Sequence, residues 1–274
     1  MQSMPRTLMT QAILCPNPSM MTLKGTNTYL ISAPGSETVT IVDPGPDGYP
    51  DHLDALQEVA DGRPVELILL THHHGDHSGA VKELHERTGA PVRAFKPELC
   101  RNAEPLADDE RILSSEAIIN VLHTPGHTSD SVCFYLAGDD ENGSVITGDT
   151  ILGQGTTMLD YPDGTLMDYF ASLERLRSVE SEGPITVLPA HGPALPDLAV
   201  AAEAYLDHRK ERLSQFKKYL ADHQFDLEQA REKDSDIAVS LYGSGTADAD
   251  TMGMRITVQM VHAMIDYLQE KGQS

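Results

Sequence analysis

A cluster of metal-binding side-chain types directly follows a strand-like apolar run. The run is VELILL, residues 65–70, and the cluster is THHHGDHSG, residues 71–79. It contains four of the chain's 12 histidines and one aspartate: His72, His73, His74, Asp76 and His77. Residues two apart on a helix point away from each other. The spacing therefore favours a loop beyond the end of a strand, where alternate side chains can converge on one point.

The composition is that of a globular protein and disfavours some classes of binding partner. Its 274 residues are 40% hydrophobic, and no apolar run approaches the ~20 residues of a membrane helix. The formal net charge of −22 and the pI near 4.7 disfavour sequence-independent binding to double-stranded DNA. The N-terminus lacks the features of a secretion signal, and three scattered cysteines fit a reducing compartment. We therefore expect a cytoplasmic protein without a membrane anchor.

Apolar runs and amphipathic segments alternate over the first two thirds of the chain. We expect strands at 38–42, 65–70, 117–122, 131–138, 144–148 and 185–189, and helices at 52–60, 80–90 and 166–176. This order predicts an α/β layered domain over residues 1–196. Residues 197–274 read as a helical C-terminal module, with a long first helix, a Gly-rich acidic loop at 241–253 and a final helix.

Three more ligand-type side chains follow apolar runs in the same way. His127 lies in HTPGHT after AIINVL, Asp149 follows SVITG, and His191 follows ITVLPA. Loops at strand ends commonly assemble a site from distant parts of a chain. Together with the first cluster, this gives five imidazoles and two carboxylates, too many for one tetrahedral zinc. The set suits two metals that share a carboxylate and a water, with zinc favoured and iron or manganese next. His73 and His123 are interpreted as a spacer and an outer-layer residue.

The ordered motifs THHHGDH, HTPGHT, GDT and PAHGP resemble those of the metallo-β-lactamase superfamily over residues 15–195. The resemblance implies an αββα sandwich with a dinuclear site at one edge. It implies that His72, His74 and His127 hold one metal, that Asp76, His77 and His191 hold the other, and that Asp149 bridges both. It also implies that Asp43, in IVDPG, supports the ligands from behind.

Three further stretches resemble the β-lactamase-like protein 2 group of this superfamily. They are residues 17–31, 151–157 and 205–216. That group includes a single-strand-specific endoribonuclease and carries a small winged-helix-like C-terminal domain, whose last helix resembles the end of this chain. An aspartate at position 149, where true β-lactamases usually carry cysteine or serine, makes antibiotic hydrolysis an unfavoured main activity. The alternative is a glyoxalase II-like thioester hydrolase, and a metal-dependent redox protein is less favoured.

The resemblance implies hydrolysis by a metal-bridging hydroxide, with no separate serine or cysteine nucleophile. Asp76 is the candidate catalytic residue that orients the hydroxide or relays its proton. Asn27 and Thr28, in GTNTY, are candidates to border the substrate cleft, although a polar hairpin turn explains them equally well. The substrate is expected to be single-stranded RNA or a small ester or thioester. A basic stretch at 209–218 favours RNA slightly, and the oligomeric state is left open.

Overall fold

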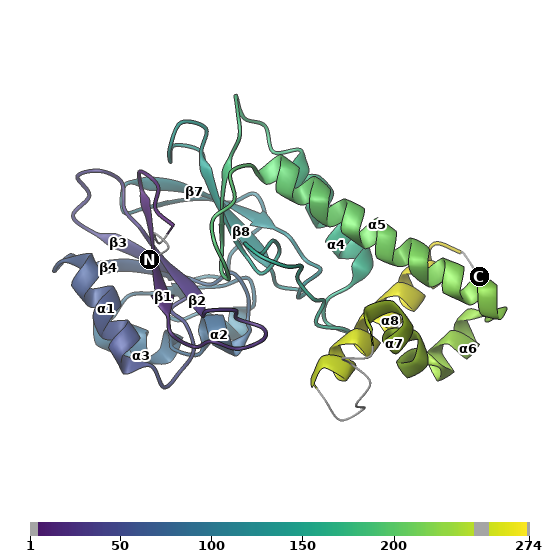
Figure 1. Ribbon diagram of the computed structural model, residues 1–274. Coiled ribbons are helices and arrows are strands. Elements are labelled where there is room, and N and C mark those ends of the chain that lie inside the picture. Colours follow the sequence, from purple (N-terminus) through teal and green to yellow (C-terminus); the bar gives the residue numbers. More distant parts are fainter. Residues whose placement is uncertain (1–4, 244–251, 273–274) are drawn as a thin grey trace.

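Two five-stranded sheets form the centre of the structure, a computed structural model that describes residues 5–243 and 252–272 (Figure 1). The first sheet has the order β1-β2-β3-β4-β5. Its strands are β1 (Thr10–Cys15), β2 (Thr26–Ile31), β3 (Val39–Val42), β4 (Val65–Leu69) and β5 (Val92–Arg93). β1 to β3 are antiparallel, whereas β3 to β5 are parallel. The carboxyl ends of β3 and β4 therefore share an edge, and Asp43 and the 71–79 cluster follow them.

The second sheet has the order β10-β9-β8-β7-β6. Its strands are β6 (Arg111–Ser114), β7 (Ala117–His123), β8 (Val132–Leu136), β9 (Ser144–Gly148) and β10 (Thr186–Pro189). β6 to β9 are antiparallel, and β9 and β10 are parallel. This parallel pair puts the residues after β9 and β10, including Asp149 and His191, at one edge of the second sheet.

Three apolar layers show the expected αββα architecture. Between the sheets, Tyr29, Val42 and Leu69 pack with Val121, Phe134 and Ile146. The outer face of the first sheet is covered by α1 (Pro50–Ala60) and α3 (Val81–Thr88), whereas α4 (Leu166–Arg177) and α5 (Leu198–His223) cover part of the second (Figure 1). α2 (Gly75–Ser78) and the 3-10 helix η1 (Pro97–Leu99) are short. The αββα fold and the predicted strands and helices are confirmed, but β1, β2, β5 and β6 were not predicted.

The C-terminal helices continue one apolar core out of the sandwich. α5 is followed by α6 (Leu227–Glu232), α7 (Asp234–Tyr242) and α8 (Met252–Glu270). Tyr169 of α4, Phe216 of α5 and Ile265 of α8 belong to the same buried cluster as strand residues of the second sheet. The side chain of Asp197 caps α5 by accepting hydrogen bonds from the backbone N–H groups of Ala199 and Val200. No flexible tether separates α5 from the sandwich.

The helical part of the C-terminal prediction is confirmed, and its winged-helix-like character is not shown. Within residues 197–243 and 252–272 the chain forms helices and turns without a strand, so these residues contain no hairpin to serve as a wing. The predicted loop at 241–253 begins at the end of α7, and its part from 244 to 251 lies outside the described residues. The boundary between 196 and 197 stays a prediction.

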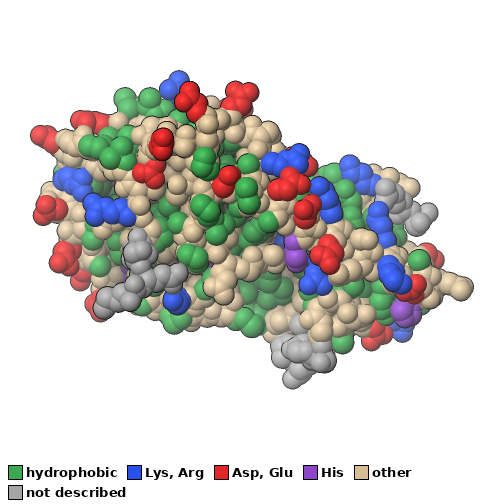
Figure 2. All heavy atoms as spheres, turned by 45° about the horizontal axis from the view of Figure 1, so that its top comes forward, with side chains coloured by type: hydrophobic (Ala, Val, Ile, Leu, Met, Phe, Trp, Pro, Cys, Tyr) green, Lys and Arg blue, Asp and Glu red, His purple; other side chains and the backbone are tan. Residues whose placement is uncertain are grey.

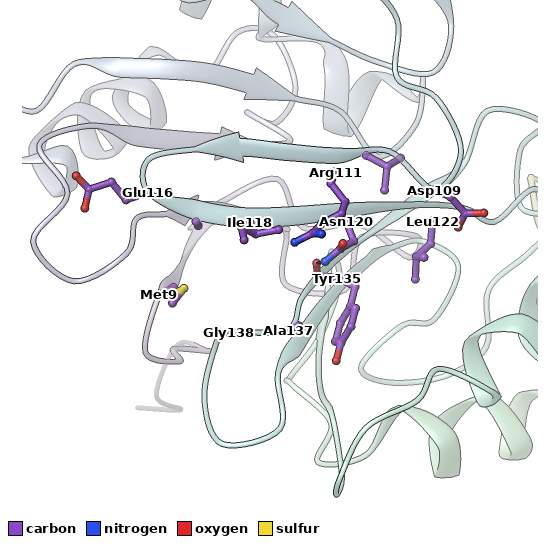
Figure 3. A pocket seen from close by; sticks show the side chains of 12 residues that line it. Met9, Asp109, Arg111, Glu116, Ile118, Asn120, Leu122, Tyr135, Ala137 and Gly138 are labelled. Carbon is purple, nitrogen blue, oxygen red and sulfur yellow. Dashed lines mark hydrogen bonds between the residues drawn. The ribbon is translucent and has the colours of Figure 1, made fainter.

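An open hollow lies on the outer face of the second sheet (Figure 3). It has a volume of about 500 Å³ and is lined by residues such as Met9, Ile118, Asn120 and Tyr135. None of its lining residues is a candidate metal ligand. Among the described helices, none combines the length and apolar character that crossing a membrane requires.

The shared core predicts that the C-terminal module resists proteolytic release. Cleavage between residues 195 and 205 should be slow in the native protein because α5 is anchored on α4. Phe216→Ala should accelerate it, since Phe216 is fully buried and such truncations cost about 3–5 kcal/mol. Val200→Ala is the matched control, because that side chain is 66% exposed. Rapid release of a folded fragment from the native protein would contradict this packing.

Candidate metal centre

All seven predicted ligands converge at the edge where β4, β9 and β10 end. Within the described residues, potential ligand atoms lie close enough to hold a metal in five groups. Two of them include His73, with His74 and Asp160 or with Asp130 and Asp163. The other three overlap and consist only of predicted ligands: His72, His74 and His127; Asp76, His77 and His191; and His72, His77 and Asp149. These three groups draw on four segments that are widely separated in sequence. The seven side chains lie together, as the sequence predicted. The assignment of each one to a particular metal stays a proposal.

The first group is a ring of three imidazole nitrogens. His72 Nε2 and His127 Nε2 each lie 3.1 Å from His74 Nδ1. Two nitrogens bound tetrahedrally to one zinc ion at ~2.0–2.1 Å are roughly 3.3 Å apart. The spacing therefore matches three ligands of a common ion. His72 and His127 are buried, whereas His74 is partly open to solvent.

The second group is joined to the first by Asp149. Asp149 Oδ1 lies 3.5 Å from His77 Nε2 and 3.4 Å from His191 Nε2. Its other oxygen, Oδ2, lies 3.7 Å from His127 Nε2 in the first group. Asp76 Oδ2 completes the second group, 3.3 Å from His191 Nε2. One carboxylate thus faces both groups, as a bridging ligand would.

Each candidate ligand imidazole is also held at its outer nitrogen. The partners are Thr71 Oγ1 for His72 (3.0 Å), Asp160 Oδ2 for His74 (3.1 Å), Asp43 Oδ2 for His77 (2.9 Å), the Met158 carbonyl for His127 (2.6 Å) and the Gly25 carbonyl for His191 (3.1 Å). An N–H that donates outward leaves the inner nitrogen with a free lone pair. Such outer partners are the usual companions of metal-binding histidines because they fix the tautomer and the ring orientation.

Asp43 occupies the supporting position that the resemblance implied. Its carboxylate accepts hydrogen bonds from the backbone N–H (2.8 Å) and the hydroxyl (2.6 Å) of Thr71, as well as from His77 Nδ1. Its φ of 53° is left-handed, a conformation that costs a non-glycine residue about 1–3 kcal/mol. The three hydrogen bonds stabilise this strained backbone. Asp43 therefore connects the end of β3 with the ligand loop after β4.

Close packing brings the loop after β9 to the same place. A Cβ atom on Gly148 would lie 2.7 Å from Thr71 Oγ1. The φ of Gly148 is also positive, at 51°. Both facts favour glycine at this position, immediately before Asp149. The strand ends of the two sheets can then approach each other closely enough for Asp149 to face His77 and His127.

The pKa shifts of the ionisable groups indicate that this centre favours positive charge. Burial raises the pKa of Asp149, but nearby imidazoles, led by His191, outweigh it and hold that pKa well below its usual range. Burial lowers the pKa of His191, but Asp149 and Asp76 reverse this and raise it to about 11. Burial and the imidazoles of His77 and His127 hold the pKa of His72 well below its usual range, despite the charge on Asp149. The carboxylates are thus anionic, and the first group offers a neutral imidazole ligand.

The ordered set of strand-end residues lies within the range that a known family model matches, or, for His191, at its end. The family model described as the metallo-β-lactamase superfamily matches residues 21–191. The chain belongs to the metallo-β-lactamase superfamily. His/Asp clusters of this kind are typical of the dinuclear metal sites of that superfamily.

Curated relatives include two proteins of the β-lactamase-like protein 2 group. The chain is 33% identical over 219 residues to the homolog of Drosophila melanogaster, which covers 74% of this chain and 70% of that protein. It is 30% identical over 221 residues to the Caenorhabditis elegans homolog, with coverages of 77% and 71%. It is also 33% identical over 205 residues to the atrochrysone carboxyl ACP thioesterase nsrC of Aspergillus novofumigatus, with coverages of 73% and 60%.

Solved structures show the same fold. A metallo-β-lactamase family protein of Thermus thermophilus superposes with a TM-score of 0.74 at 22% identity, covering 96% of this chain and 94% of that one. The protein TTHA1623, solved in a di-iron-bound form, has a TM-score of 0.53 at 28% identity, with coverages of 68% and 93%. The first likeness extends over the C-terminal helices as well as the sandwich.

The residues of this superfamily member fit a pair of divalent metals. His77 Nε2 and Asp149 Oδ1 are buried and make no hydrogen bond within the described residues. A buried polar atom left without a partner costs about 1–3 kcal/mol. Metal coordination would satisfy both atoms, and a set of imidazoles and carboxylates suits zinc, iron or manganese.

Asn27 and Thr28, the candidates to border the substrate cleft, make hydrogen bonds to the loops of the site. Both lie in β2 rather than in a turn, and both are buried. Asn27 Nδ2 donates to the carbonyls of Pro189 (2.9 Å) and Gly192 (3.0 Å), which flank His191. Thr28 Oγ1 donates to the carbonyl of Asp43 at 2.6 Å. These hydrogen bonds hold the site's loops, and the role of both residues at the substrate cleft stays a prediction.

His73 and His123, which lie outside the ligand set, have structural partners. His73 Nδ1 lies 2.7 Å from Asp130 Oδ1 and 3.0 Å from the ammonium of Lys96. That ammonium, also 3.6 Å from Asp130 and Asp163, supplies positive charge to this outer cluster. His123 stacks on Phe95 with ring centroids 3.9 Å apart. These placements agree with the interpretation of both histidines as spacer and outer-layer residues.

Cys15 and Cys133 are buried and unsuited to act as nucleophiles. Burial raises the pKa values of Cys15 and Cys133 to about 11. Neither thiol is therefore ionised near neutral pH, and a thiol must ionise to react readily. Cys100 lies outside the ligand motifs, as the sequence indicated.

We predict that the purified protein binds two metal ions per chain. Asp149→Ala should lower the metal content and nearly abolish hydrolysis, because it removes the carboxylate that faces both groups. Elemental analysis of wild-type and variant protein measures this directly. Asp139→Asn is not a suitable control, since Asp139 is itself buried and hydrogen-bonded. Asp47 is exposed, so Asp47→Ala is a suitable control. It should leave the metal content and the hydrolytic activity unchanged. One tightly held metal, with activity intact in Asp149→Ala, would exclude a dinuclear centre.

Proposed function

We propose that this protein is a dinuclear metal-dependent hydrolase, with zinc as the metal. His72, His74 and His127 would hold one ion; Asp76, His77 and His191 would hold the other; and Asp149 would be a ligand to both. The observation that carries the proposal is that all five imidazoles are fixed at their outer nitrogens while their inner nitrogens face a shared centre. When bound, two such ions supply a hydroxide nucleophile near neutral pH and stabilise the charge that develops on a substrate oxygen.

Side chains of the protein position the attacking water and hold the ligand loops. The Asp76 side chain is 28% exposed, so its carboxylate reaches the open side of the centre while Oδ2 faces His191 and His77. In this position Asp76 can accept a hydrogen bond from the attacking water and receive its proton. Asp43 and Asn27 keep the ligand loops in place from behind. A buried, preorganised set of this kind avoids reorganisation during the reaction.

Part of the basic stretch at 209–218 is used in internal contacts rather than in a cationic face for RNA, although Lys210, Lys217 and Lys218 are exposed. Arg209 is only 4% exposed, donates to the carbonyl of Thr157 and lies over the ring of Tyr169. Arg212 Nη1 donates to the carbonyl of Leu241 at 2.8 Å, and Lys218 pairs with Asp222. Figure 2 shows basic and acidic side chains interspersed on the face that it displays, without a continuous basic surface.

We therefore propose a thioester, or a related acyl ester, as the substrate. Two observations support this choice over RNA. The net charge of −22 opposes polyanion binding, and a relative at 33% identity is named as an acyl carrier protein thioesterase. In the proposed reaction, water oxygen forms a bond to the acyl carbon and the carbon–sulfur bond breaks. A carboxylic acid and a thiol result, and the thiol sulfur takes up a proton released from water.

Cleavage of single-stranded RNA is the second candidate. It is favoured by the similarity to the β-lactamase-like protein 2 homologs over about three quarters of the chain, because the group resembled includes an endoribonuclease. If RNA is the substrate, α5 to α8 would bind the nucleic acid in the role of a winged-helix-like domain.

One metal-loaded preparation separates the two substrates. A glutathione thioester and a fluorescent single-stranded RNA should be assayed side by side, and we expect turnover of the thioester with RNA left intact. Asp149→Ala should abolish the thioester activity, which excludes a contaminating enzyme. Lys210→Glu, which reverses an exposed charge on α5, should not change it. Efficient cleavage of RNA that is lost in Asp149→Ala and weakened by Lys210→Glu, with the thioester untouched, would overturn the acyl proposal.

A further inference from the structure

The loop between β9 and α4, residues 149–165, carries two of the outer partners of the ligand histidines. The carbonyl of Met158 faces His127 Nδ1, and the carboxylate of Asp160 faces His74 Nε2. His74 and Asp160 are 86 positions apart, and no motif connects them. We propose that Asp160 is a positioning residue for His74, and that the C-terminal helices hold it in place. The C-terminal module then tunes metal binding. This inference rests on the proposed dinuclear site.

The contacts of the two His74 ring nitrogens indicate how Asp160 would position this histidine. His74 Nδ1 points to His72 Nε2 and His127 Nε2, each 3.1 Å away, so Nδ1 is the nitrogen that would bind the proposed metal and would carry no proton there. The proton then sits on Nε2, which lies 3.1 Å from Asp160 Oδ2. A carboxylate there fixes the tautomer, orients the ring and makes its lone pair a stronger donor. His74 lacks the deep burial of His72 and therefore depends more on such a contact.

The loop is fixed closely against the ligand that follows β7. The backbone N–H of Asp160 donates to the carbonyl of His127 at 2.8 Å, and Gly164 N–H donates to the carbonyl of Asp160 at 2.8 Å. A Cβ atom on Gly164 would lie 2.2 Å from the carbonyl oxygen of Gly126 and 2.3 Å from that of His127. No larger residue fits this approach without displacing the loop.

Contacts from the C-terminal helices hold the other side of the loop. The Tyr161 hydroxyl donates to Asp266 Oδ2 of α8 at 2.6 Å, and Gln259 Nε2 donates to the Tyr161 carbonyl at 3.2 Å. Arg231 of α6 pairs with the other oxygen of Asp266. From α5, Arg209 donates to the Thr157 carbonyl. The residues on both sides of Met158 and Asp160 are thus attached to the C-terminal module, which links that module to His74 and His127.

Removing the carboxylate should weaken metal binding without dismantling the site. Losing an outer partner of a ligand histidine typically costs about 10–100-fold in metal affinity. The Asp160 side chain is 40% exposed, so we expect the lower end, about tenfold, for Asp160→Ala. Asp160→Asn keeps an acceptor oxygen without the charge and should restore part of the affinity. Asp163→Asn is the matched control, because Asp163 lies on the same loop with 36% exposure and contacts Ser129 and Lys96 instead.

The readouts for Asp160 do not depend on activity. Chelator competition measures the affinity for zinc, and the visible spectrum of the cobalt-substituted protein reports the geometry at the metal. We expect weaker binding and an altered spectrum in Asp160→Ala, with Asp163→Asn like the wild type. If the wild type binds two metals and Asp160→Ala matches it in affinity and spectrum, the positioning role is wrong. If the wild type does not bind two metals, the proposed function itself fails.

A second pair of variants tests the connection to α8. Tyr161→Phe removes the hydroxyl that reaches Asp266 and touches no metal ligand. Tyr267→Phe removes a hydroxyl from α8 itself; among the described residues, the Tyr267 ring contacts Phe170 and Lys271. We expect Tyr161→Phe to weaken zinc binding about threefold with the cobalt spectrum shifted in the same direction as in Asp160→Ala. Tyr267→Phe should change neither. Equal metal affinity and spectra in both variants would overturn the role of the C-terminal helices.

Discussion

Asp149 imposes the constraint on which the rest of the site depends. Its carboxylate is largely removed from water, and its two oxygens face different groups of imidazoles. A buried anion needs opposite charge nearby, because burial without a partner costs several kcal/mol. The fold meets this need by ending β4, β9 and β10 at one edge, so that ligand loops from both sheets surround the same carboxylate. The proposed pair of metals would provide the matching charge.

Around this centre, the fold uses much of its hydrogen bonding to hold loops rather than to contact a substrate. Asp43 joins the ends of β3 and β4, Asn27 joins β2 to the His191 loop, and Asp160 joins the loop before α4 to His74. Each link crosses between segments that are distant in sequence. Because the C-terminal helices attach to the last of these loops, the module is part of the architecture of the site as well as a neighbour of it.

The sequence predicted those features whose cause is local. Apolar runs followed by ligand-type residues indicated six of the ten described strands and the seven candidate ligands, because each motif lies directly beyond a strand end. The αββα arrangement of the layers was implied by the family resemblance. The roles of Asp160, Asn27 and Arg209 could not be read in this way. Arg209 looked like part of a basic stretch that favours RNA, yet it is buried against Tyr169 and the Thr157 carbonyl. Nothing in the helical spacing of α5 indicates a partner that only tertiary packing brings near.

The most direct test of this account is anomalous diffraction at a metal absorption edge from crystals of the metal-loaded protein. The account predicts two peaks about 3.5–4 Å apart. One should lie among His72, His74 and His127, the other among Asp76, His77 and His191, with Asp149 between them. A single peak, or ions located instead at the outer cluster of His73, Asp130 and Asp163, would contradict it.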